Sequence, residues 1–470
     1  MNIFDVLERL GTLKSRNYSR ARLKSNFTQY VDNWKAHYRG NVVGVNQAQG
    51  YNGESFFPIT RLSMRLAKLI AQKWVTLLFT EAFAVTLKDE AETEKFRQLE
   101  KQIDFRSKLN QAALFGYAEG TSALLASADI EIDTHSDAVT GGKVKLDVIR
   151  YDNLYPLAFD AADIQSIAFV RTEQEKNATI YTISIHAIEG EKVTIENIVA
   201  RVQGEQLDFS AAETVTQFQT FNSQMFAWIR PNIVNDFSDI LPFGQSIFAD
   251  ALASIVDVDL AADGLRRDLE ESPQLTFVGR DLFLSQMEGE KKKKVLDNSR
   301  GKFFIIPQKL GEQGTDIKQL FERVTPEIRT VQFWQVVKDS LDWATLCSGL
   351  GHGALDVAPL RTATQTVYLE AAKMQNKSLH EQYLEGQIIK IVKALCELSG
   401  LTGNPIDASD VNIVWSDSVV IDTTTEKKLS LQEIDAGVIC KAEYREKYMG
   451  ETPEEAQAKI DAMQRFPDDI

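Results

Sequence analysis

The spacing of apolar residues divides the chain into a helical part, a strand-forming part and a second helical part. In the first 120 residues, apolar positions recur every three or four residues, which predicts helices. Tyr30, Trp34 and Tyr38 fall on one face of a helix that Gly40 ends, and core packing explains this aromatic stripe. The other elements predicted here are a helix over 59–78, a strand over 82–87 and a helix over 91–117 that is interrupted at Gly116.

Between residues 122 and 228 the apolar period shortens to two, which is typical of strands. The predicted strands cover 122–126, 144–150, 164–172, 180–187, 192–202 and 217–228. Turn-forming pairs such as Gly141-Gly142 separate them, so we expect an antiparallel sheet in an α+β fold. His186 lies in one of these strands without a second metal ligand nearby, and we interpret it as a structural histidine.

Two long amphipathic patterns follow, over about 247–271 and 326–347, and each predicts a helical rod of about 30–35 Å. Thr325 and Pro326 have the residue types of an N-cap and a first helical position, so they mark the start of the second rod. The predicted apolar seam of the second rod consists of Ile328, Val331, Trp334, Val337, Leu341 and Ala344.

Charged residues gather on the first rod and between the rods. The first rod carries two acidic stripes, one of Asp250, Asp257 and Asp268 and one of Asp259, Asp263 and Glu270. Such stripes are most often solvated faces. Between the rods, short strands are predicted over 274–278 and 302–307, near the basic residues Lys291, Lys292, Lys293, Lys294, Arg300 and Lys302. These cations favour either a solvated loop or an exposed contact for a protein or phosphate partner.

A glycine-rich connector, residues 349–361, follows the second rod. Gly349, Gly351 and Gly353 alternate, but no Lys-Ser/Thr follows at P-loop spacing, so no nucleotide site is predicted. A helix then runs from Thr362 to 399, with Gly386 as its one weak point. Its length of roughly 55 Å implies neighbouring chains or a very elongated monomer. A strand over 411–416 and short capped helices complete the chain.

Composition limits the function classes. The 470 residues, 44% apolar and 25% charged, suit two or three domains of a soluble protein. No stretch approaches the roughly 20 apolar residues of a membrane span, and the N-terminus has no signal-peptide core, so we expect synthesis and residence in the cytoplasm. Cys347, Cys396 and Cys440 lack the spacing of a zinc site and are predicted to be buried, inert thiols.

The formal net charge of −15 argues against a protein that grips nucleic acid over its whole surface, because tight phosphate binding needs clustered cations. An acidic wall repels phosphates, so the charge favours DNA that passes by without sticking. No Ser/His/Asp set, HExxH, Walker or DxD pattern stands in a convincing context, and neither an enzymatic activity nor a cofactor is predicted.

The order of these elements resembles the portal proteins of tailed double-stranded DNA bacteriophages, and the resemblance covers nearly the whole chain. The matching runs include WKAHYRG, MRLAKLIAQKWVTLLFTE, YDNLYPLAFD, LPFGQSIFADALASIVDVDLAADGLRRDLE, TPEIRTVQFWQVVKDSLDWATLCSGLGHGAL and VNIVWSDSVVIDTTTEKKL. Each run alone is weak, and their joint order is specific. Gln365 departs from the acidic residue usual in the family at that position.

The resemblance implies a portal-like α+β fold and names for its parts. These are a wing (1–243, with the long helix and closing strand of 362–416), two stem helices (244–272 and 325–348), a clip (273–324), a tunnel loop (349–361) and a crown (417–470). It also implies a ring, typically of 12 subunits, at one vertex of the capsid, which assembles in the host cytoplasm. Double-stranded DNA would pass through the ring during packaging and ejection. Expected partners are the terminase large subunit, the head-completion adaptor and the major capsid and scaffolding proteins, and no membrane.

The expected sites follow from these names. The DNA-facing tunnel loop would comprise Gly351, His352, Gly353, Ala354, Leu355, Asp356, Val357 and Arg361. Asp250, Asp257 and Asp268 would line the channel. Lys291 to Lys294, Arg300 and Lys302 would form the docking surface of the clip. The alternative is another oligomeric virion or minor capsid protein without a DNA channel, and an enzyme is a third possibility.

Overall fold

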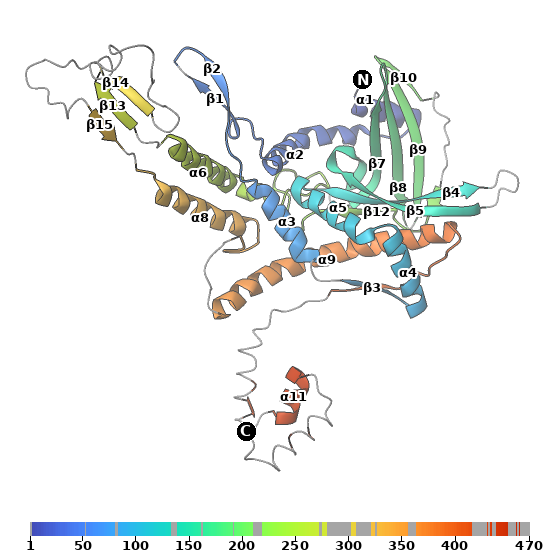
Figure 1. Ribbon diagram of the computed structural model, residues 1–470. Helices are drawn as coiled ribbons and strands as arrows, with labels where there is room; N and C mark the ends of the chain where they lie inside the picture. Colours follow the sequence, from blue (N-terminus) through green and yellow to red (C-terminus); the bar gives the residue numbers. More distant parts are fainter. Residues whose placement is uncertain are drawn as a thin grey trace, which may run out of the picture.

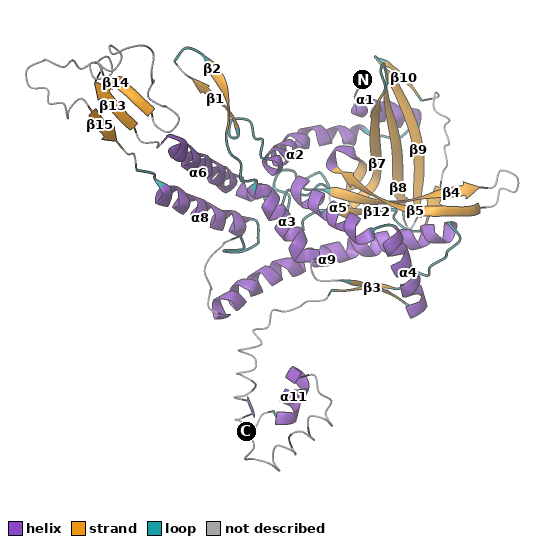
Figure 2. Ribbon diagram, viewed as in Figure 1, coloured by secondary structure: helices purple, strands orange, loops and turns teal. Residues whose placement is uncertain are grey.

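The computed structural model shows a mixed α+β protein in which two helices project from a larger body (Figures 1 and 2). The structure describes residues 2–51, 53–79, 83–132, 139–160, 163–190, 192–209, 219–271, 275–279, 302–306, 321–324, 327–355, 363–415 and 439–449, with single positions at 430, 433–434, 457 and 460. The α+β prediction is therefore confirmed.

The helices of the N-terminal part are α1 (Ile3–Leu13), α2 (Lys24–Arg39), α3 (Leu66–Phe79), α4 (Glu90–Gln102) and α5 (Phe105–Glu119), with a 3-10 turn at Ser19–Leu23. Helix α2 ends as predicted at Gly40, which has a φ of 70°. The predicted 91–117 helix breaks at Asp104 (φ 53°) and not at Gly116. Gly116 lies inside α5, where a Cβ atom would stand 2.7 Å from the carbonyl oxygen of Ile229, so close packing explains this glycine.

The predicted helix over 59–78 begins too early, because its first residues belong to a hairpin. Strands β1 (Gln47–Tyr51) and β2 (Phe56–Thr60) pair antiparallel, and α3 starts only at Leu66. The sequence PITRLSM places a proline and polar residues where a helix would need continuous spacing. In Figure 1 this hairpin lies beside the two projecting helices, residues 252–271 and 330–347.

The predicted antiparallel strands form two sheets. The larger has the order β10 (Gln206–Asp208), β9 (Lys192–Gln203), β8 (Thr179–Glu189), β7 (Asp163–Gln174) and β6 (Leu154–Asp160), with β11 (Gln219–Phe221) also paired to β9. The smaller has the order β12 (Phe226–Ile229), β4 (Ser122–Ile132) and β5 (Val139–Arg150). The 217–228 prediction thus divides between two sheets. Strand β6 was not predicted, because a bulge between Pro156 and Ala158 interrupts its alternation of apolar and polar residues.

The core lies where helices cover these sheets. Helix α1 packs its apolar face on the larger sheet through Val6, Leu7 and Leu10. The long helix α9 (Ala363–Leu401) packs against β4 and β12 and runs without interruption through Gly386. His186 is buried edge-on against Phe169, and burial lowers the pKa of His186 to about 3, which suits the structural role predicted for it.

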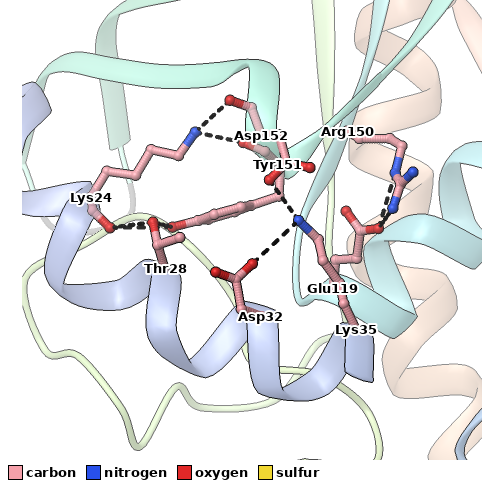
Figure 3. A network of polar contacts seen from close by, with 8 residues as sticks. All are labelled: Lys24, Thr28, Asp32, Lys35, Glu119, Arg150, Tyr151 and Asp152. Atoms are coloured by element: carbon pink, nitrogen blue, oxygen red, sulfur yellow. Dashed lines mark hydrogen bonds and ion pairs between the residues drawn. The ribbon is translucent and has the colours of Figure 1, made fainter. Parts of the chain in front are cut away.

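A network of polar contacts joins α2 to the turn between β5 and β6 (Figure 3). Lys24 is buried and donates to the main-chain carbonyl oxygens of Tyr151 at 2.7 Å and Asp152 at 2.9 Å. Its ammonium group also lies over the rings of Tyr151 and Tyr155. Burial holds the pKa of Lys24 well below its usual value. Beside it, Lys35 donates to the Asp152 carboxylate at 2.5 Å. The network fixes the direction of α2 relative to the sheets.

The remaining elements form the projecting part and the C-terminal part. They are a 3-10 turn at Ala249–Ala251, α6 (Leu252–Glu271), β13 (Leu275–Gly279), β14 (Lys302–Ile306), β15 (Phe321–Val324), α8 (Thr330–Cys347), β16 (Val411–Val414) and α11 (Lys441–Met449). Strand β13 pairs parallel with β14 and antiparallel with β15. As Figure 1 shows, this small sheet lies at the far end of α6 and α8.

The strand predicted over 411–416 forms as β16. Strand β16 pairs antiparallel with β3 (Ala84–Leu87), so a segment from beyond the long helix returns to the N-terminal part. The prediction of buried thiols is wrong for two cysteines. Cys396 is buried, which raises the pKa of its thiol to about 12, whereas Cys347 and Cys440 are exposed.

Candidate functional site

The candidate site is the rod pair, α6 and α8, with the glycine loop, residues 349–355, that follows α8. The two helices lie side by side (Figure 1) and pack closely because α6 has a glycine at the contact. A Cβ atom on Gly264 would lie 2.6 Å from the Phe333 ring. Further along α8, Val337 and Leu341 are half-buried and Ala344 is fully buried. The pair is thus one unit with a defined inner face.

Helix α8 corrects two predictions. It begins at Thr330, and residues 327–329 are not helical; Thr325 and Pro326 themselves lie outside the described residues. The predicted seam also divides. Its later members, Val337, Leu341 and Ala344, turn toward the core, but its earlier members, Ile328, Val331 and Trp334, are exposed.

Four exposed apolar residues of α8 lie on two flanks, and Leu346 is exposed between these flanks on the side away from the core. Trp334 and Trp343 are 65% and 60% exposed, and their separation of nine positions corresponds to about two and a half turns of an α-helix. They therefore point to opposite sides of the helix. Val331 accompanies Trp334, and Val336 lies on the side of Trp343. Buried positions such as Ala344 fall between the two flanks.

The predicted acidic stripe has three different environments. Asp257 is exposed on α6. Asp250 accepts a hydrogen bond from the Gln245 side chain at 3.2 Å, and partial burial raises the pKa of Asp250. Asp268 accepts from the guanidinium of Arg329 at 2.8 and 3.0 Å, and these hydrogen bonds lower the pKa of Asp268. Within one chain, Arg329 thus neutralises the Asp268 charge.

The second acidic stripe is not a solvated face, because Asp259 and Asp263 are buried. Asp259 accepts from the Asn46 side chain at 2.9 Å and from the Met64 N–H at 2.7 Å. Asp263 accepts from the Leu62 N–H at 3.1 Å and also binds Arg267. Both carboxylates therefore hold the hairpin root, residues 42–46 and 61–64, against the rod. The sequence pattern could not show that this stripe is buried, because its carboxylates accept hydrogen bonds from main-chain N–H groups some 200 residues away.

The glycine loop is folded tightly at its start. Gly349, Gly351 and Gly353 all have positive φ angles, between 66° and 81°, a conformation that favours glycine at these positions. The Gly351 N–H donates to the carbonyl oxygen of Thr345 at 3.1 Å, and the Gly353 N–H donates to the Asp342 carboxylate at 3.2 Å. His352 stays exposed, 3.9 Å from Asp342.

Side chains from the body fix the base of this loop. The Trp74 indole donates to the carbonyl oxygen of Ser348 at 2.8 Å, and Asn376 of α9 donates to that of Gly349 at 2.8 Å. His380, also on α9, lies against the Trp74 ring with centroids 4.6 Å apart. These partners were not predicted from the sequence, because neither their positions along the chain nor their residue types indicate a contact with the loop.

Several predicted site residues lie outside the described residues. These are Asp356, Val357 and Arg361 of the connector, and Lys291, Lys292, Lys293, Lys294 and Arg300 between the rods. Lys302 is the first residue of β14, as the predicted strand requires, and Ala354 and Leu355 end the described part of the loop. Ala354 and Leu355 also pack against the main core.

Across the described ranges, no group of three or more His, Cys, Asp and Glu side chains is placed to hold a metal ion. No helix in the same ranges combines the length and apolarity needed to cross a membrane. A cleft of about 490 Å³ lies between α4, β5 and the turn after α9, away from the rod pair. No family model matches the chain, and no curated protein matches it.

Proposed function

We propose that this chain is a subunit of a head-to-tail ring that surrounds double-stranded DNA, as the portal proteins of tailed bacteriophages do. One observation carries the proposal: Trp334 and Trp343 are exposed on opposite flanks of a helix whose side between them, with Val337 and Ala344, is already packed. A ring subunit has two neighbours and buries a different surface against each. A symmetric dimer would cover one of these flanks and leave the other in water.

The arrangement of the parts supports the same proposal. The body would be the wing (1–243 with 362–416), α6 and α8 the stem (244–272 and 325–348), and the small sheet between them part of the clip (273–324). Residues 349–361 would be the tunnel loop and 417–470 the crown. A two-helix projection that bears a small sheet at one end and a glycine loop at the other suits a subunit that spans a channel wall from one opening to the inner constriction.

Charge gives the channel its proposed behaviour. The chain has a net charge of −15, and repeated copies of exposed Asp257, with Asp250, would line the channel with negative charge. Such a wall keeps phosphates from binding, so a duplex slides. Asp268 contributes little to this effect, since Arg329 pairs with it. His352 at the exposed start of the loop would meet phosphates weakly.

The partners follow from the proposed position at the capsid vertex. The basic residues Lys291 to Lys294, with Arg300 and Lys302, would form the surface on which the terminase large subunit docks during packaging. A head-completion adaptor would replace it afterwards, and capsid and scaffolding proteins would contact the outer part of the ring. Charge reversal at these lysines should weaken terminase binding while the mass of the ring stays unchanged.

Electron cryomicroscopy of the purified full chain tests the proposal. We expect rings, about 12-fold, with an axial hole wide enough for a duplex and with α6, α8 and the glycine loop facing that hole. Replacement of Trp334 or Trp343 by serine should each reduce ring formation, whereas Val234→Ser, at an exposed position on the body, should not. A monomer, a closed dimer, or an assembly without an axial hole would contradict the proposal.

A second test separates the channel from the ring. Deletion of residues 353–358 should leave rings intact but impair DNA packaging or retention. Rings that package normally after this deletion would show that the loop does not act on DNA.

A further inference from the structure

The hairpin of β1 and β2 carries aromatic side chains that the described residues of its own chain leave exposed. Tyr51 and Phe56 are 60% and 72% exposed, and Phe57 is also exposed. Tyr51 and Phe56 face each other across the strands with ring centroids 4.9 Å apart. Large apolar side chains on a projecting arm are costly in water and are typical of contact surfaces.

The hairpin is held rigidly at its root. Buried Asp259 and Asp263 accept hydrogen bonds from Asn46, Leu62 and Met64, and the Arg61 N–H donates to the carbonyl oxygen of Asn46 at 2.8 Å. An arm fixed in this way loses little conformational entropy when it binds, which favours a defined partner surface. Because the anchors are on α6, the arm keeps its position relative to the rod pair.

The arm and α8 lie on opposite sides of α6. Asp259 and Asp268 are nine residues apart, which is a rotation of half a turn beyond two full turns. Asp259 holds the hairpin root, whereas Asp268 binds Arg329 next to α8. Figure 1 agrees, with the hairpin on one side of α6 and α8 on the other. The arm and α8, each with exposed apolar side chains, therefore lie on opposite sides of α6.

We propose that the aromatic arm of one copy packs on the flank of α8 that carries Val331 and Trp334 in the next copy. This inference rests on the ring of the proposed function and names one of its contacts. A donor surface on one side and an acceptor surface on the other is the arrangement that a closed head-to-tail ring requires. Phe333 of α8 packs on Gly264 of α6, and the neighbouring Asp263 binds the hairpin root. The flank with Val331 and Trp334 therefore lies at the same position along α6 as the hairpin root.

Size and charge favour a second copy as the occupant. Tyr51 and Phe56 lie on one face of the hairpin, and Phe57 lies on the other. Each buried aromatic ring removes roughly 150–250 Å² from water, so the two rings of one face supply a substantial part of the roughly 800 Å² per partner of a stable interface. The exposed turn of the hairpin carries Glu54, and the flank carries exposed Lys338 beyond Trp334. Opposite charges would thus accompany the apolar contact.

Cysteine cross-linking tests the contact in the full chain. The exposed native thiols are first removed by Cys347→Ser and Cys440→Ser. Phe56→Cys and Val331→Cys are then combined in one chain and treated with a short bismaleimide. We expect covalent products that extend beyond the dimer up to the complete ring. A mixture of the two single-cysteine chains should give dimers only, and Phe56→Cys combined with Val234→Cys should give no ladder.

A second measurement guards against an unsuitable cysteine pair. Phe56→Ser with Phe57→Ser should raise the concentration needed for half-assembly at least about tenfold, the effect of losing about 1.4 kcal/mol per contact. Rings that form at the usual concentration in this variant, without cross-links in the other, would overturn the arm contact and leave the ring proposal standing. Wild-type chains that stay monomeric at all concentrations would overturn both. Cross-linked dimers that never extend would show a reciprocal contact and contradict a head-to-tail arrangement.

Discussion

The indole N–H of Trp74, in the middle of α3, donates a hydrogen bond to the main-chain carbonyl oxygen of Ser348, the residue after the end of α8. Trp74 is fully buried, so this 2.8 Å bond is shielded from water. It ties the body of the protein to the position where the rod becomes the glycine loop. In the proposed ring, the base of the tunnel loop would therefore be fixed to the body.

Replacement of Trp74 by phenylalanine should loosen the base of the loop. The change leaves the buried Ser348 carbonyl without its donor, which costs about 1–3 kcal/mol, and it also opens a space beside His380. Hydrogen exchange should speed up at Gly349 and Gly351, and urea denaturation should show a lower stability. Trp343→Phe is the matched control, because that indole is exposed. Equal exchange at the loop in both variants would show that the Trp74 bond does not hold it.

The part of this arrangement that depends on local spacing could be predicted from the sequence. Positive φ angles at alternating glycines, the end of α2 at Gly40 and the length of the long helix all follow from residue types within a few positions. The partners of the loop could not be predicted. Trp74 and Asn376 contact it across 274 and 27 positions of the chain, and only the folded core brings them together.

Two helical glycines should respond in opposite ways to alanine. Gly116→Ala should destabilise the protein, because the new methyl group would meet the carbonyl oxygen of Ile229, a main-chain atom that cannot move aside easily. Gly386→Ala should stabilise it by about 1 kcal/mol, since nothing lies within 4 Å of the added atom and alanine favours the helix. Thermal and urea denaturation of both variants give the comparison. A stabilised Gly116→Ala protein would contradict the close packing of α5 on β12.

Acid should weaken the fold partly through His380. Its Nδ1 accepts hydrogen bonds from the Tyr117 hydroxyl at 2.9 Å and the Asn232 N–H at 3.1 Å, and burial lowers the pKa of His380 from 6.5 to about 4. Between pH 4 and pH 6.5, this histidine binds a proton in the unfolded chain but not in the folded chain. The free energy of unfolding therefore falls as the pH falls from 6.5 to 4. The full effect is roughly 3 kcal/mol.

The His380→Gln variant isolates this contribution. It should be less stable at neutral pH, and its stability should fall less steeply between pH 6.5 and 4 than that of the wild type. His186 remains in both proteins, and because burial lowers its pKa from 6.5 to about 3, it contributes the same loss to both as the pH falls from 6.5 to 3. Denaturant titrations at several pH values measure both slopes. Identical slopes would mean that His380 is protonated in the folded state as readily as in the unfolded chain.

The errors in the candidate site have one physical cause. Helical periodicity states which residues share a side of a rod, but it does not state what that side contacts. The acidic stripe of Asp259 and Asp263 has the spacing of a solvated face, yet it is buried by the hairpin root. Conversely, Trp334 has the spacing of a core residue and is exposed, because α6 covers a neighbouring side of α8. Amphipathic patterns of this kind are ambiguous wherever a second chain completes the packing.

The buried carboxylate of Asp259 should control assembly through the arm. In Asp259→Asn, an NH₂ group replaces one of the two carboxylate oxygens, which accept from Asn46 and Met64. One buried hydrogen bond is then lost, because the new NH₂ donor faces another donor. We expect faster hydrogen exchange in residues 42–64 and a higher concentration for ring formation. Asp257→Asn makes the same chemical change at an exposed position of the same helix and should alter neither quantity. Asp259→Asn could instead loosen the arm while rings still form as readily as in the wild type. That result would show that the hairpin does not take part in ring contacts, and the contact between copies would have to lie elsewhere on α8.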